Sequence, residues 1–96
     1  MALNQNNIFM VVPQADSSKI VAAAVAKYPD DYYPLAHGAF LVAAQGKTTK
    51  GISDELGISG GDNGSAVVVA VSSYFGRANP QIWEWMKAKM GGGANA

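Results

Sequence analysis

Apolar runs and helical stripes alternate along the chain and predict a mixed α+β fold. The run IFMVV, Ile8–Val12, is β-branched and aromatic, and it is closed by Pro13, which cannot donate a hydrogen bond within a sheet, so it predicts a first strand. Asp16 and Ser17 then stand where a helix N-cap belongs, and the apolar positions that follow repeat at helical spacing. This helix is expected to end before Pro29.

Two further short strands are expected at Tyr32–Ala36 and Ala39–Ala44, because both runs are apolar or aromatic and a His-Gly pair separates them. His37 and Gly38 predict a tight turn, in which His37 adopts a positive φ angle. A catalytic role for this histidine, the single one in the chain, has only its residue type in its favour.

A second, short helix is predicted in the segment KTTKGISDELGIS, with a threonine cap at 48 or 49 and Gly57 at its C-terminal end. Glycines crowd the residues from Gly57 to Gly64, which predicts a mobile loop. A phosphate-binding loop is disfavoured, because such loops lead from a strand into a helix and this one leads from a helix into a strand. The strand itself, SAVVVAVSSY, has the clearest strand pattern in the chain.

A third helix is predicted in NPQIWEWMKAKMGGG, with Asn79 as its N-cap, Pro80 as its first residue and Gly91 as its stop. Residues 1–90 are expected to form one domain, followed by a disordered tail at 91–96.

The aromatic residues of this third helix favour packing over ligand binding. At 100° per residue, Ile82 and Met86 share one side of the helix, while Trp83 and Trp85 flank it and diverge by about 160°. The two indoles therefore cannot stack successive bases on one platform. They widen an apolar face, so Trp83, Trp85 and Met86 are predicted to lie in a core or in a subunit interface.

The predicted order is β-α-β-β-α-β followed by an extra helix, the pattern of a ferredoxin-like sandwich within the α+β class. Within the first and last strands, Ile8–Val12 and Val67–Val71 are apolar on both faces, whereas burial of one face alone would place polar residues at every second position. Two helices of such a fold cover one face of the sheet. The other face is expected to be covered by the third helix or by another subunit.

Composition narrows the functional classes. The 96 residues carry seven Lys and Arg against seven Asp and Glu, and this zero net charge lacks the basic footprint that sequence-independent nucleic-acid binding requires. With no cysteine and a single histidine, no metal or other cofactor is predicted. The sequence MALNQNNIFMVVP has no secretory pattern and no apolar run approaches membrane-spanning length, so a cytoplasmic protein without membrane contact is expected.

The layout of these segments resembles the SinR-like ferredoxin-fold proteins related to the CRISPR adaptation endoribonuclease. The resemblance rests on IFMVV as the first strand, YYPLAHGAFLVAA as the hairpin, TKGISDELGI as the following helix and SAVVVAV as the last strand. It implies dimerisation through the exposed sheet face. Nuclease members resemble one another in an Asp at the end of the first strand, where this chain has Val12, Pro13 and Gln14, and the nearest acid, Asp16, is a predicted helix cap.

The stretch SSYFGR is the first place to expect a binding site. Tyr74 and Phe75 stand beside Arg77, the single arginine of the chain, a combination favoured at protein interfaces and for phosphate or carboxylate capture. The alternative for Arg77 is that it caps the preceding structure or forms an ordinary surface ion pair. Lys47 and Lys50 are further candidates for a binding surface.

Three functions follow from these patterns. A small non-enzymatic homodimeric protein that binds another macromolecule is the leading hypothesis, because the sheet is apolar on both faces and the chain has little charge. A divergent metal-dependent ribonuclease would depend on Asp16. A small nucleic-acid-binding protein would use Lys47, Lys50 and Arg77, with affinity that falls steeply with salt. By analogy, small neutral proteins of this kind also occur in phages and mobile elements.

Overall fold

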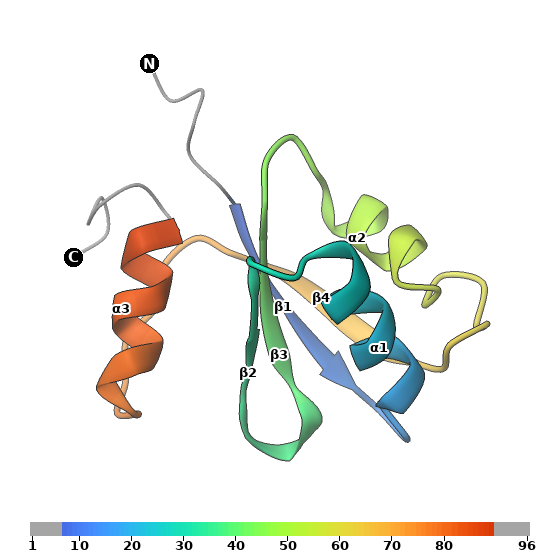
Figure 1. The fold of residues 1–96 in the computed structure, drawn as a ribbon, viewed down its shortest axis with the longest axis horizontal. Coiled ribbons are helices and arrows are strands. Elements are labelled where there is room, and N and C mark those ends of the chain that lie inside the picture. The colour runs from blue at the N-terminus through green and yellow to red at the C-terminus, as the bar shows by residue number, and fades with distance from the viewer. Residues whose placement is uncertain (1–6, 90–96) are drawn as a thin grey trace.

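The computed structural model describes residues 7–89, which form a four-stranded antiparallel sheet and three helices (Figure 1). The elements follow in the order β1 (Asn7–Pro13), α1 (Ser18–Lys27), β2 (Tyr32–Pro34), β3 (Phe40–Ala44), α2 (Thr49–Glu55), β4 (Ala66–Val71) and α3 (Pro80–Lys89). The strands lie in the order β2-β3-β1-β4, which confirms the α+β class. The predicted helix stop at Gly91 and the predicted tail lie outside the described residues.

The helices begin where the sequence places their caps. The Thr48 side chain accepts a hydrogen bond of 3.0 Å from the backbone N–H three residues on, and the Asn79 side chain accepts one of 2.9 Å from the N–H two residues on. At α1 the Asp16 carboxylate accepts the bond, whereas the Ser17 side chain makes none. These bonds satisfy N–H groups that have no partner within the first helical turn.

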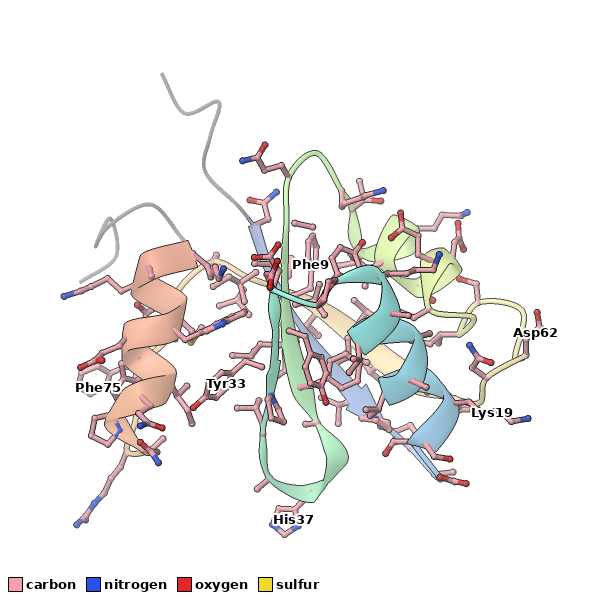
Figure 2. All side chains as sticks on the ribbon, in the orientation of Figure 1. Phe9, Lys19, Tyr33, His37, Asp62 and Phe75 are labelled. Atoms are coloured by element: carbon pink, nitrogen blue, oxygen red, sulfur yellow. The ribbon has the colours of Figure 1, made fainter. Side chains whose placement is uncertain are left out.

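The hairpin differs from its predicted form. β2 ends at Pro34 rather than at residue 36, and Ala36–Gly38 form a single 3₁₀ turn before β3. The Leu35 N–H still donates to the Ala39 carbonyl at 2.8 Å, but the chain turns between these two residues, with His37 at a positive φ angle, so the strand is shorter than the apolar pattern suggests. His37 has φ 61°, the positive angle predicted for it, and lies at the tip of the hairpin (Figure 2).

The glycine-rich loop after α2 is held by more hydrogen bonds than its composition suggests. Asn63 fastens the loop to the end of the helix: its backbone N–H donates to the Gly57 carbonyl at 2.9 Å, and its side-chain amide donates to the Leu56 carbonyl at 2.8 Å. Two further N–H groups, of Ile58 and Ser59, donate to the Ser53 carbonyl. The prediction of a mobile connector considered the glycines alone and overlooked these bonds.

Both faces of the sheet are apolar. The first face carries Phe9 and Val11 of β1, and these pack beneath α1 and α2. The second face carries Ile8 of β1 with Leu41 of β3, and these pack against Met86 of α3. Figure 1 shows α1 and α2 on one side of the sheet and α3 on the other. Part of the second face is therefore covered by the third helix of the same chain.

Candidate functional site

α3 lies on the second face through its aromatic residues. The Trp85 ring lies 5.5 Å from the ring of Tyr33, which points from β2 toward α3 (Figure 2). The Trp83 ring stacks on Tyr74, with centroids 5.5 Å apart and ring planes within 6°. Met86, 4% exposed, completes the contact, and the two indoles pack against different tyrosines. That Trp83, Trp85 and Met86 also contribute to a subunit interface stays a prediction.

Lys89 ties the end of α3 to the connection between α1 and β2. Its Nζ forms an ion pair of 2.8 Å with Asp31 and donates a hydrogen bond of 3.0 Å to the Asp30 carbonyl. The same ammonium group lies 5.9 Å from the centre of the Trp85 ring, within the range of a cation–π contact. The sequence offered no signal for this contact, because its partners are far apart along the chain and look like ordinary surface charges.

The second face is open over β4. In the register between β1 and β4, Val67 lies opposite Val12 and Val69 opposite Met10, which places both β4 valines on the second face. Their side chains are 49% and 37% exposed. The part of this face formed by Val67 and Val69 is called the valine stripe below. It is surface, although its sequence pattern is that of a core strand.

The predicted binding residues Tyr74, Phe75 and Arg77 lie in the segment between β4 and α3. Tyr74 is fixed by its stack on Trp83, whereas Phe75 is fully exposed and lies on the side of α3 that faces away from the sheet (Figure 2). Arg77 is exposed, and within residues 7–89 it forms no ion pair. An exposed aromatic ring beside a guanidinium group is the composition of an interface anchor.

The predicted lysines belong to another part of the molecule. Lys47 pairs with Glu55, which also accepts a hydrogen bond from the Tyr28 hydroxyl, and Lys50 pairs with Asp54 at 2.9 Å. The bonds from Lys47 and Tyr28 lower the pKa of Glu55, while burial and then the bond to Glu55 raise the pKa of Tyr28. The third cation proposed for the same surface, Arg77, lies in the segment between β4 and α3, and α3 lies on the opposite side of the sheet from α2 (Figure 1). The structure therefore does not join Lys47, Lys50 and Arg77 into one cationic surface.

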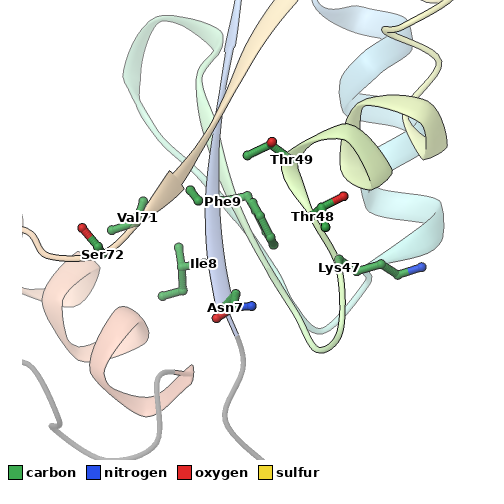
Figure 3. A pocket seen from close by; sticks show the side chains of 9 residues that line it. Asn7, Ile8, Phe9, Lys47, Thr48, Thr49, Val71 and Ser72 are labelled. Atoms are coloured by element: carbon green, nitrogen blue, oxygen red, sulfur yellow. The ribbon is translucent and has the colours of Figure 1, made fainter.

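Two of the hollows on the described surface lie next to β1 or the second face. One, of about 380 Å³, lies where β1 begins and β4 ends, and Figure 3 shows the Lys47 side chain pointing away from Val71 and Ser72 there. The other, of about 270 Å³, lies between α3 and the second face and is lined mainly by apolar side chains, among them Met10 and Ile82. Lys47 is the charged residue that lines the first of these hollows, and its ammonium group pairs with Glu55, whereas the residues that line the second are uncharged.

The nuclease alternative depends on Asp16. Its carboxylate accepts a hydrogen bond of 2.9 Å from the Ser18 N–H, and this bond is the main cause of its lowered pKa. Among residues 7–89, no three acidic or histidine side chains gather closely enough to hold a metal ion.

No helix in the same range is long and apolar enough to cross a membrane.

No protein-family model matches the chain, and neither a curated protein nor a solved structure matches it. Its function therefore has to be argued from the surfaces just described.

Proposed function

We propose that the chain is a small non-enzymatic homodimeric protein that acts by binding another macromolecule. The main support is the exposure of large apolar side chains at the valine stripe on the second face and at Phe75 ahead of α3. Removing apolar surface from water is favourable by about 25 cal/mol per Å², so such side chains favour contact with another molecule. Apolar patches on otherwise polar surfaces commonly mark interaction sites.

The two exposed places suit different contacts. The valine stripe belongs to a regular strand without charge, which suits association with an identical surface. Phe75 and Arg77 lie in an irregular segment, and together they suit a partner that offers an apolar pocket beside a carboxylate or phosphate group. In this proposal the stripe holds the dimer together and the Tyr74–Arg77 segment contacts the partner.

The ferredoxin-like arrangement is the fold-level part of the proposal. The order β-α-β-β-α-β supports it, as does the position of β3 between β1 and β2, which are joined through α1. A relationship to the SinR-like proteins and a cytoplasmic location stay predictions.

Partner binding is tested by isolating the tagged protein from its source cells as wild type, as Phe75→Ser and as Val25→Ser. Val25 is an exposed apolar residue of α1, on the other side of the sheet, and serves as the matched control. We expect a macromolecule at fixed stoichiometry with the wild type and with Val25→Ser, and its loss with Phe75→Ser. Equal recovery with all three proteins, or recovery with none, would contradict the proposed partner surface.

The non-enzymatic part is tested against the ribonuclease alternative. Purified protein is incubated with RNA and magnesium or manganese, beside Asp16→Ala. We expect no cleavage by either protein. Metal-dependent cleavage that disappears in Asp16→Ala would replace binding by catalysis as the function.

A further inference from the structure

β4 is an edge strand whose own sequence carries none of the usual protection against pairing. β1 pairs with it on one side, and within residues 7–89 no strand lies on its other side. Proteins usually block such an edge with a charged side chain, a proline or a bulge. The sequence SAVVVAVSS, residues 65–73, contains no charge and no proline, and its register with β1 runs without interruption over the whole of β4.

The direction of the unpaired groups follows from one hydrogen bond. The Gln14 N–H donates to the Ser65 carbonyl at 2.9 Å, so residue 65 directs its backbone groups toward β1. In an antiparallel pair these directions alternate along the strand. Residues 67, 69 and 71 therefore bond to β1, while the N–H and C=O groups of Ala66, Val68 and Ala70 point outward from the sheet. The free edge thus offers alternating donors and acceptors in the spacing of a second strand.

We infer that this edge pairs with β4 of a second copy of the chain, antiparallel and around a two-fold axis, so that the two sheets become one continuous sheet. The inference rests on the proposed homodimer and specifies its contact. A two-fold axis at Val68 sets Ala66 opposite Ala70 of the second copy, which joins outward-pointing groups to one another.

The same axis also buries the valine stripe. Directly opposed residues of antiparallel strands lie on the same face, so Val67 comes to lie opposite Val69 of the second copy, and Val69 opposite Val67. These two exposed valines then cover each other on the second face. On the first face each Ala66 opposes an Ala70, and on the axis Val68 opposes Val68 of the second copy.

A second copy fits this edge better than an unrelated strand. Paired with itself, the strand opposes no like charges, because it carries none, and the whole chain has a net charge of zero. The two-fold axis also keeps α1 and α2 of both copies on one side of the joined sheet and α3 of both copies on the other. A strand of another protein remains an outcome that the experiment below detects.

The edge is tested by amide hydrogen exchange, measured by NMR on the full chain at concentrations at which it is a dimer. The amides of residues 67, 69 and 71 are bonded to β1 and serve as an internal control, slow in monomer and dimer alike. We expect the amides of Ala66, Val68 and Ala70 to exchange about 100-fold more slowly in the dimer than in the diluted monomer. Fast exchange at these three positions in a stable dimer would overturn the edge pairing.

Ala70→Pro removes an outward N–H without removing a bond to β1, and proline is tolerated at such an edge position. We expect this variant to have the mass of one chain by light scattering, and Ala70→Ser, which keeps the N–H, to have the mass of two. A dimeric Ala70→Pro would overturn the edge pairing while the homodimer itself stands. A wild type that is monomeric at every concentration would overturn both, and a wild type that pairs only when a foreign strand is added would assign the edge to another protein. If Ala70→Pro loses protection at residues 67, 69 and 71, its fold is damaged and the wild-type exchange pattern decides.

Discussion

The two faces of the sheet are buried to different extents, although the same strands form both. On the first face, Phe9 and Phe40 are almost completely buried beneath α1 and α2. On the second face, α3 packs through Met86 and two half-buried tryptophans and leaves the valine stripe in contact with solvent. The strands are equally apolar on both faces, but one face forms a core and the other is a partly exposed surface.

The difference has a simple geometric cause. Strands lie about 4.8 Å apart, and a helix with its side chains is about 10 Å wide, so one helix covers about two strands. Two helices therefore cover the four strands of the first face, whereas α3 alone covers about half of the second. A sheet that is apolar on both faces and has a single helix on one of them is left with an apolar surface.

The largest effect on stability is expected from truncating a buried side chain in the first-face core. Phe9→Ala should lower the free energy of unfolding by about 3–5 kcal/mol, because the ring is buried and the cavity cannot fully collapse. Urea unfolding followed by circular dichroism measures this loss. A loss below about 1 kcal/mol would show that the first face is not the main core.

A smaller effect, on the second face alone, is expected from Met86→Ala, which should cost about 2 kcal/mol at the α3 contact. Both tryptophans of the chain lie on α3, so their fluorescence reports the docking of this helix, while circular dichroism reports the whole fold. In Met86→Ala we expect the fluorescence transition to precede the circular dichroism transition. Coincident transitions in this variant would mean that α3 is an inseparable part of one core.

The loop behind α2 should show an effect of about 1–2 kcal/mol. Gly57 has φ 73°, and a Cβ there would lie 2.4 Å from the Asn63 side-chain nitrogen, so Gly57→Ala adds a steric conflict to backbone strain. Gly61→Ala is the matched control, since Gly61 also has a positive φ, 79°, but open space around it. Gly57→Ala should be the less stable variant in thermal unfolding, and equal stabilities would show that the Asn63 contact contributes nothing.

The smallest effect is expected from pH. Hydrogen bonds from Lys47 and Tyr28 hold the pKa of Glu55 below its usual 4.5, so Glu55 adds stability above that pH, and this is lost as pH falls through its lower folded pKa. The pKa of Tyr28 is raised, so its contribution is complete below pH 10.0 and is lost as pH rises through its folded pKa. Glu55→Gln should flatten the acid side of the stability curve. Glu84→Gln, on the water-facing side of α3, is the control for the loss of one negative charge. A pH dependence of stability below pH 7 that Glu55→Gln leaves unchanged would contradict the proposed contribution of Glu55.

Local signals in the sequence predicted local structure well. The caps at Thr48 and Asn79 depend on one side chain and the next turn of backbone, and the buried side of α3 depends only on its helical spacing. The turn at His37 was likewise readable from its neighbours. The length of β2 was predicted wrongly because its apolar pattern continues through Ala36, a residue that belongs to the turn.

Contacts between distant segments were not predicted. The ion pair of Lys89 with Asp31, and the pairing of Glu55 with both Tyr28 and Lys47, join residues whose types are common on any surface. The sequence pattern also predicted that the second face is covered, but it did not indicate how much of this face one helix covers. That extent depends on widths and positions in three dimensions, and it decides where the candidate surface lies.

The most direct test of the account is the native mass of the purified chain, measured by light scattering over a wide concentration range for the wild type and for Val67→Lys. A lysine at this position places like charges across the two-fold axis and leaves the first-face core untouched. The account predicts the mass of two chains for the wild type, and the mass of one for a Val67→Lys variant with unchanged circular dichroism and tryptophan fluorescence. A wild type with the mass of one chain at every concentration, or a Val67→Lys variant that is still a dimer, would contradict it.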